Sequence, residues 1–225
     1  MPDDDDRDDD RDDDRDRHLR WTVLERTQVA DYRIFRAHRA RARHPRGTSI
    51  HDFIVLTGGD WVNVIALTPD DQVVLLRQYR AGSDKVELEI PGGLVDPGED
   101  HGAAARRELL EETGYRAPRW RHLGSTSPNP AIQDNRLHTW LALDATPAGP
   151  ATPEEGEALE VSTAPLAEVT RMLRDGRIEH ALVVVAFAHL ALAGDLALAR
   201  PPEAAAEPEE AAAGPSGGAE TTGRP

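Results

Sequence analysis

Four glutamates lie at fixed offsets in residues 93–115, which read GLVDPGEDHGAAARRELLEETGY; they are Glu99, Glu108, Glu111 and Glu112. Residues 101–113 are rich in Ala, Leu, Arg and Glu, a composition that predicts a helix. Gly114 follows as a left-handed stop signal. On that helix the last three glutamates share one side, because they are three and four residues apart.

Like charges at this spacing repel one another, so the acidic side of the helix needs a counter-ion. An all-oxygen cluster suits a hard divalent cation such as Mg²⁺ or Mn²⁺. A solvated acidic helix face is the simpler alternative. The glycine-rich turn immediately before the helix argues for the cation.

Apolar and alternating runs predict the strands that position this helix, at 21–26, 31–38, 49–57, 61–68, 72–79 and 85–90. Turn residues at 58–60 and 69–71 make a hairpin of the fourth and fifth strands. The arginine-rich stretch 36–46 has no interleaved aromatic residues, so we expect a solvated strand edge or turn there and not a nucleic-acid surface.

After the helix, strands are expected at 120–125, 137–144 and 160–163, and helices at 165–175 and 179–198. The loop 126–135 contains two prolines and is a candidate substrate loop. Strands, helix, strands and then helices predict an α/β fold in which helices cover both sides of a mixed sheet.

Both ends differ in composition from the middle of the chain. Residues 3–17 are eleven Asp and four Arg, and residues 201–225 are mostly Pro, Glu, Ala and Gly, so we expect residues 1–18 and 201–225 to be disordered tails. Residues 18–200 carry a net charge of only −4, which favours no nucleic-acid partner. There is no cysteine, no signal-peptide pattern and no apolar run long enough for a bilayer, so we expect a cytoplasmic protein without membrane contact.

The full spacing of the acidic segment is G-x5-E-x7-R-E-U-x-E-E-x-G-U, with U a bulky apolar or aromatic residue. The fixed positions are Gly93, Glu99, Arg107, Glu108, Leu109, Glu111, Glu112, Gly114 and Tyr115. This pattern resembles the Nudix hydrolase family. The resemblance implies an α/β/α sandwich that hydrolyses a nucleoside diphosphate linked to another moiety, with Mg²⁺ or Mn²⁺ neutralising the diphosphate and lowering the pKa of the attacking water.

The resemblance also implies roles for the residues of the motif. Glu108 and Glu112 are the first choice as metal ligands, followed by Glu111, and the Gly92 carbonyl completes the site by analogy. Arg107 is expected to orient the glutamates by ion pairing. Glu99 is either an outer ligand or a structural partner of the turn, and Gly93 and Gly114 are structural.

Features outside the motif are similar to the ADP-ribose pyrophosphatase branch of the family. Pro130 lies fifteen residues beyond Tyr115, and the phrases at 77–80 and 87–93 resemble this branch. Extra N-terminal strands are typical of it, so residues 19–57 are expected to form an antiparallel extension that makes a homodimer, with the Nudix domain at 58–200.

In this branch a late loop supplies an acidic residue that acts as general base or binds a metal. Glu155 and Glu157 occupy that place, and either could take a proton from the attacking water; a solvated acidic loop is the alternative. Arg80 is a candidate phosphate contact, since a guanidinium pairs bidentately with phosphate oxygens. No histidine cluster with ligand spacing is visible.

The sequence therefore predicts a metal-dependent enzyme that cleaves ADP-ribose, or a related nucleoside diphosphate sugar, into AMP and ribose 5-phosphate. Within the enzyme class the alternatives are GDP-mannose, NADH or an oxidised nucleoside triphosphate as substrate. Outside it, one alternative is a sensor that binds ADP-ribose without cleaving it, although the motif glutamates are all present. Another is an interaction arm formed by the Asp/Arg-rich tail.

Overall fold

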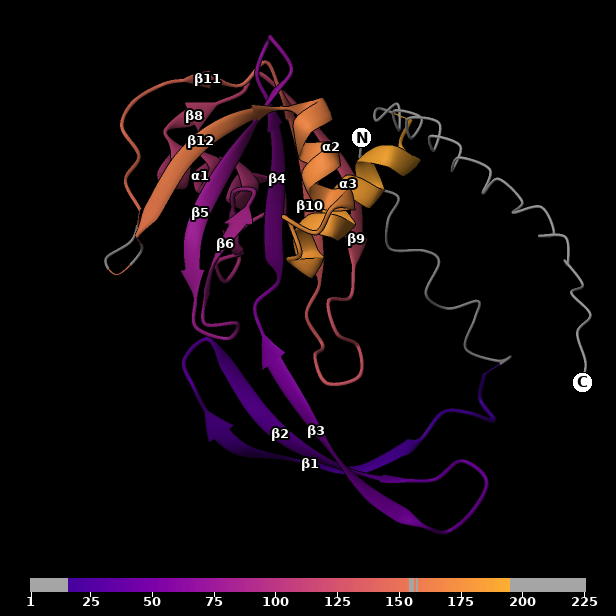
Figure 1. The fold of residues 1–225 in the computed structure, drawn as a ribbon. Coiled ribbons are helices and arrows are strands. Elements are labelled where there is room, and N and C mark those ends of the chain that lie inside the picture. Colours follow the sequence, from indigo (N-terminus) through magenta and orange to yellow (C-terminus); the bar gives the residue numbers. More distant parts are fainter. Residues whose placement is uncertain (1–15, 154–155, 157, 195–225) are drawn as a thin grey trace, which may run out of the picture.

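The computed structural model describes residues 16–153, 156 and 158–194, so most of both tails, together with Glu155 and Glu157, lies outside the described residues. A three-stranded antiparallel sheet, ordered β1-β2-β3, stands below the body of the molecule (Figure 1). Its strands are β1 Thr22–Asp31, β2 Phe35–Arg43 and β3 Ile50–Gly58.

The body is built on a seven-stranded mixed sheet with the path β12-β5-β4-β10-β9, to which β6 and β7 add beside β5 and β4. Among the strand pairs of the described residues, β4 and β10 are the parallel pair. The elements are β4 Trp61–Leu67, β5 Gln72–Arg80, β6 Lys85–Glu89, β7 Gly92–Leu94, α1 His101–Thr113, β9 Arg119–Thr126, β10 Leu137–Leu143, β12 Leu159–Pro165, α2 Leu166–Arg174 and α3 Ala181–Leu192; a separate two-stranded ladder pairs β8 Tyr115–Arg116 with β11 Thr146–Pro147.

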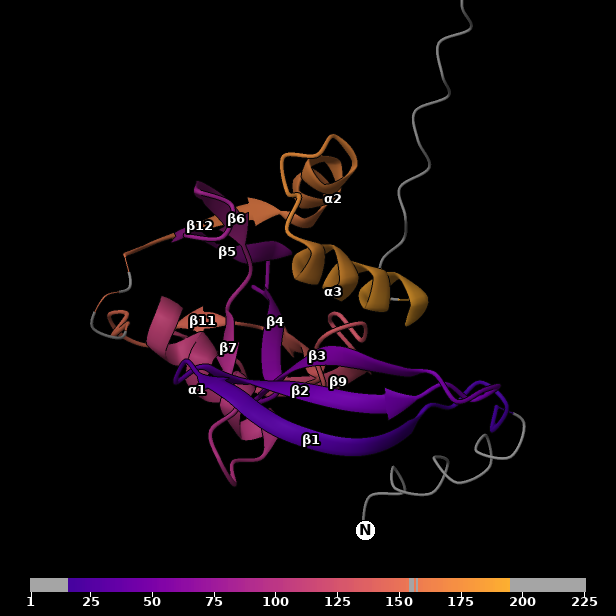
Figure 2. The same ribbon diagram turned by 90° about the horizontal axis from the view of Figure 1, so that it is seen from below.

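Alternating side chains of the central strands build two cores, one on each face of the sheet. On one face, Val62 and Val64 of β4 pack with Leu109 of α1. On the other, Ile65 of β4 and Leu75 of β5 join a cluster with side chains of α2 and α3. Strands buried on both faces read as continuous apolar runs. Seen from below, α1 lies on the opposite side of the sheet from α2 and α3 (Figure 2), which confirms the predicted α/β/α arrangement.

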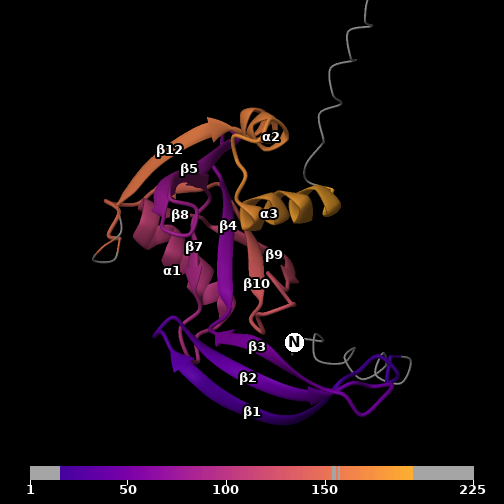
Figure 3. The ribbon, with the colours of Figure 1, turned by 60° about the horizontal axis from the view of Figure 1, so that its bottom comes forward.

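The N-terminal strands differ from the expected ones. The strand predicted over 31–38 is interrupted at 32–34 by a hairpin turn, in which Arg33 adopts a positive φ of 66° and the Tyr32 N–H donates to the Phe35 carbonyl, so that only 35–38 belong to β2. The arginine-rich stretch is not a turn but mostly β2, the middle strand of the sheet, in which Ala37, Ala40 and Ala42 are buried. Figure 3 shows this sheet extending well past the body. Within the described residues, no helix has the length and apolar character needed to cross a membrane.

Candidate active site

Helix α1 is fixed at both ends by its own sequence. The Asp100 side chain accepts hydrogen bonds from the N–H groups of Gly102 and Ala103, so it caps the N-terminus. Gly114 ends the helix in the left-handed conformation at φ 71°, and its N–H donates to the Leu110 carbonyl. The helix has the bounds predicted from composition, so its glutamates share the expected face.

Two of the helix glutamates lie directly against the backbone of β7. Glu112 is buried, and its Oε2 accepts a 2.8 Å hydrogen bond from the Gly92 N–H. The Glu108 carboxylate packs on Gly93 so closely that a Cβ there would lie 2.3 Å from its Oε1. The glycine turn therefore brings backbone and carboxylate oxygens together: a Cβ at position 93 would collide with Glu108, and one at position 92 with the Val62 carbonyl of β4.

Arg107 lies at the centre of the acidic cluster. Its guanidinium donates to both Glu99 oxygens at 3.0 and 3.1 Å, to Glu108 at 2.8 Å and to Glu111 at 3.2 Å. It also reaches the Leu94 carbonyl at 2.8 Å. These partners raise the pKa of Arg107 above its ordinary value, with the hydrogen bond to Glu99 as the largest cause. The guanidinium thus faces other protein groups of the motif, as an orienting role requires.

Glu99 is held as a partner of the turn. Its carboxylate accepts from the Asp96 N–H at 3.1 Å as well as from Arg107. The Arg107 hydrogen bond is the main cause that holds the pKa of Glu99 below its ordinary value, against a smaller effect of burial. Of the two roles considered for Glu99, these contacts favour the structural one.

The donor set of this cluster fits a hard divalent cation. The carboxylates of Glu108 and Glu112 stand over the Gly92–Gly93 backbone, and Glu111 is the more exposed neighbour, with 41% of its side chain accessible. All of these groups offer oxygen, which Mg²⁺ and Mn²⁺ prefer to nitrogen or sulfur.

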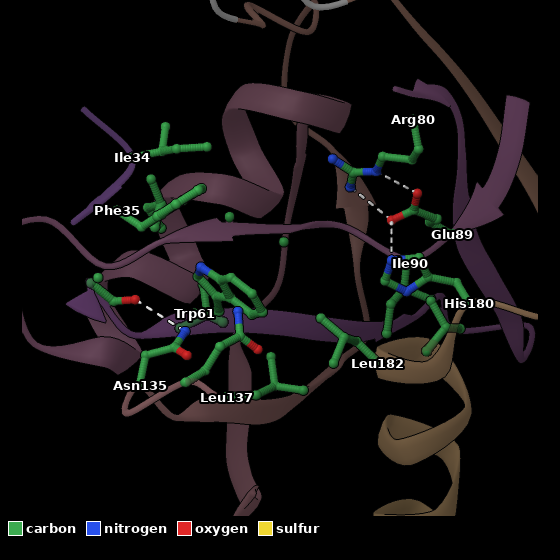
Figure 4. Close-up of a pocket in the computed structure, with 18 of the residues that line it drawn as sticks. Ile34, Phe35, Trp61, Arg80, Glu89, Ile90, Asn135, Leu137, His180 and Leu182 are labelled. Atoms are coloured by element: carbon green, nitrogen blue, oxygen red, sulfur yellow. Dashed lines mark hydrogen bonds and ion pairs between the residues drawn. The ribbon is translucent and has the colours of Figure 1, made fainter. Parts of the chain in front are cut away.

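A cavity of about 380 Å³ adjoins the glycine turn, and Gly92 and Gly93 form part of its wall. Most of its other walls are apolar, with Trp61 and Leu137 from the central strands (Figure 4). Ile34 and Phe35 of the N-terminal sheet also line it. The cavity is therefore shared between the extension and the body.

Arg80 lines this cavity in an ion pair with Glu89. Its Nε and Nη2 donate to the two Glu89 oxygens at 2.7 and 2.8 Å, and Glu89 is only 4% exposed (Figure 4). His180 Nε2 lies 4.0 Å from the same carboxylate. The guanidinium is thus held at the cavity by a buried carboxylate, while 42% of the Arg80 side chain is exposed.

The substrate loop reaches the cavity through different residues from the one singled out by sequence. Pro130 is exposed and does not line the cavity. Gln133 and Asn135 do, and Asn135 is anchored by a 3.2 Å hydrogen bond to the Gly59 carbonyl. The isolated bridge between Leu56 and Gln133 ties the loop to β3.

Sequence reasoning missed a cluster of three histidines on the α1 face of the sheet. One ring nitrogen from each of His101, His122 and His138 lies within 4.8 Å of the others. Their sequence spacings of 21 and 16 residues have no ligand signature. Only the pairing of β9 with β10, and the packing of α1 on them, brings the rings together.

The fold is an α/β/α sandwich. Its glycine turn and glutamate-bearing helix lie beside a cavity, and their oxygen atoms form a site suited to a divalent cation, an arrangement typical of a metal-dependent hydrolase. Comparison with known protein families matches residues 59–187 to the family described as the NUDIX domain. The chain belongs to the Nudix family, and it is a Nudix hydrolase.

Three similar proteins give the comparison detail. The chain is 33% identical over 159 residues to the CMP-5'-(N-acetyl-N-hydroxy-3-aminopropyl)phosphonate hydrolase of Streptomyces rubellomurinus, covering 71% of this chain and 76% of that protein. It is 27% identical over 132 residues to the ADP-ribose pyrophosphatase of Bacillus subtilis, covering 58% and 71%. A crystal structure of an ADP compounds hydrolase superposes with a TM-score of 0.69 at 27% identity, covering 79% of this chain and 97% of that one.

Proposed function

We propose that this enzyme hydrolyses the pyrophosphate bond of ADP-ribose or a related nucleoside diphosphate sugar, with Mg²⁺ or Mn²⁺, and releases AMP and ribose 5-phosphate from ADP-ribose. The observation that carries the proposal is the packing of Glu108 and Glu112 on the glycine turn, at the wall of a largely apolar cavity. The similarity to an ADP-ribose pyrophosphatase and to an ADP compounds hydrolase supports the substrate class.

The role proposed for each residue follows from the position of its charge. Glu108, Glu112 and the Gly92 carbonyl would hold the cation, with Glu111 beside them. The cation, when bound, neutralises diphosphate oxygens and makes water a better nucleophile. Arg107 would orient the carboxylates of Glu108 and Glu111, because its Nη1 donates a hydrogen bond to each of them. Glu155 and Glu157, which lie outside the described residues, remain our candidates for the group that takes the proton from the attacking water.

The cavity supplies binding. Trp61 and Phe35 offer apolar and aromatic surface for a nucleobase or sugar. Arg80, held by Glu89, presents a fixed cation suited to phosphate oxygens. We keep the Pro130 loop as a substrate contact through its cavity-lining residues Gln133 and Asn135.

A substrate panel with Mg²⁺ tests the proposal. It contains ADP-ribose, GDP-mannose, NADH, an oxidised nucleoside triphosphate and a CMP-linked phosphonate, with nucleotide release measured for each. We expect ADP-ribose to give the highest kcat/KM, with AMP as product. The CMP-linked phosphonate is the second candidate, because the similarity to the Streptomyces hydrolase favours it. A higher kcat/KM for any compound other than a nucleoside diphosphate sugar contradicts the substrate assignment.

We also propose that the N-terminal sheet joins two copies of this cytoplasmic enzyme into a homodimer. Ile50 and Ile54, two of its large apolar residues, share one face of β3 and are 46% and 50% exposed. Exposed apolar surface of this kind marks an interaction site. The double variant Ile50→Asp/Ile54→Asp is expected to sediment as a monomer, while Leu192→Asp, at an 86% exposed position on α3, stays dimeric. A monomeric parent protein would contradict the assignment.

A further inference from the structure

We infer that His101, His122 and His138 form a second metal site, which takes a borderline divalent ion such as Zn²⁺ and is separate from the glutamate cluster. The three residues come from different elements: His101 opens α1, His122 lies on β9 and His138 on β10. One ring nitrogen from each lies within 4.8 Å of the other two. Imidazole nitrogen suits Zn²⁺, Ni²⁺ and Co²⁺, whereas Mg²⁺ prefers oxygen, so the two sites select different ions.

His138 is already held as a metal-ligating histidine would be. Its Nε2 lies 3.1 Å from the Asp60 Oδ2, and the other Asp60 oxygen accepts the Arg136 N–H at 2.8 Å. A carboxylate that accepts from one ring nitrogen fixes the tautomer, which leaves the lone pair on Nδ1. Since the ring is buried, the direction of that lone pair is set by the fold.

The nitrogens of His122 and His138 point to one place. The Ser125 Oγ lies 2.7 Å from His138 Nδ1 and 3.1 Å from His122 Nε2. One oxygen can contact both only if both nitrogens converge on it. An ion between the rings would replace this bridge, with nitrogen at about 2.0–2.1 Å, and Ser125 or water would fill the remaining position.

His101 must turn for the third bond. Its ring stacks on that of His138 with centroids 4.2 Å apart and planes 6° from parallel. Two stacked parallel rings cannot both direct a nitrogen at the same ion. Binding therefore rotates His101 and breaks the 3.1 Å hydrogen bond that its Nδ1 accepts from the Trp140 Nε1–H. Trp140 becomes a reporter of occupancy.

Co²⁺ titration of the full chain in excess Mg²⁺ tests the site, because Mg²⁺ occupies carboxylate sites without competing for imidazoles. We expect the intense visible absorption of Co²⁺ in a four-coordinate nitrogen-rich site, together with a change in tryptophan fluorescence. His122→Ala should abolish both signals, and Asp60→Asn should weaken the affinity about 10- to 100-fold. His18→Ala, at an exposed histidine before β1, is the control and should keep both.

One further readout, Mg²⁺-supported hydrolysis, separates this site from the glutamates. Hydrolysis supported by Mg²⁺ should be unchanged in His122→Ala, because that side chain lies outside the acidic cluster. If that variant folds poorly by circular dichroism in chelator, His101→Ala repeats the test at a half-buried position. An unaltered Co²⁺ spectrum in either folded variant, or a parent protein that shows only the weak absorption of an oxygen site, overturns the inference.

Discussion

The Glu108 carboxylate occupies the space where any residue other than glycine at position 93 would place its side chain. A Cβ on Gly93 would lie 2.3 Å from Glu108 Oε1 and 2.8 Å from its Oε2. The glycine is therefore needed for close approach of a side chain, and the position of the carboxylate depends on it.

Gly93→Ala is expected to displace Glu108 and to weaken Mg²⁺ affinity by about 10- to 100-fold, in line with the loss of correct ligand positioning. Because the obstacle is the end of a side chain, the fold should survive. Mg²⁺ titration of activity and thermal unfolding check the two parts. Gly82→Ala, where a Cβ meets nothing within 4 Å, is the control and should match the parent.

Glu112→Gln should lower kcat by at least about 100-fold, the scale on which a fixed electrostatic partner of the reaction acts. The amide oxygen can still accept the Gly92 N–H, so the melting temperature should change little. Steady-state kinetics with ADP-ribose and calorimetry measure both. Near-parent turnover in the folded variant would show that Glu112 is not a metal ligand.

Arg107→Lys should destabilise the fold by about 1–3 kcal/mol, because acceptors that lose their donor stay partly buried. Lysine keeps the charge, but its single ammonium cannot reach Glu99, Glu111 and the Leu94 carbonyl together. Urea unfolding gives the free energy. Arg116→Lys, on an exposed strand residue, serves as the control, and equal losses in the two variants would contradict the central position of Arg107.

Acid should remove part of the stability through Glu99. Its pKa is lower in the folded chain than its ordinary value of 4.5, mainly because of Arg107. Its contribution is therefore fully present above that ordinary value and is lost as the pH falls through the lower, folded-state pKa. Glu99→Gln should unfold at a lower temperature than the parent at neutral pH, and the two curves should converge in acid. Parallel curves at all pH values would exclude this origin.

The acidic helix was predictable because its signals are local. Helix composition, the Asp100 cap and the Gly114 stop all act within a few residues of α1, so its bounds and its shared glutamate face follow from spacing. The core strands were predictable for the same reason, since continuous apolar runs such as 73–76 are buried on both faces.

One misassigned part is local, because the turn at Arg33 is closed by the hydrogen bond from Tyr32 to Phe35, whereas the others depend on partners distant in sequence. Tyr32 and Ile34 look like strand residues, yet they are exposed around a turn at Arg33. Residues 36–43 largely alternate Arg with Ala, which is compatible with a strand. Alanine is so small, however, that the sequence alone does not show that these residues form a buried face. The cavity walls from Gln133 and Asn135 likewise depend on where β3 holds the loop.

The walls of the cavity come from two pieces of the chain that have separate sheets. Ile34 and Phe35 reach it from the hairpin turn and start of β2, while the carboxylates that we propose as ligands of the cation are carried by α1. If the proposed function is right, a sequence change in the hairpin would alter which molecules are accepted without moving a proposed ligand of the cation. Under the proposed function, a change of substrate would therefore require mutations in the N-terminal hairpin, whereas the hydrolysis reaction would depend on the separate stretch that encodes α1.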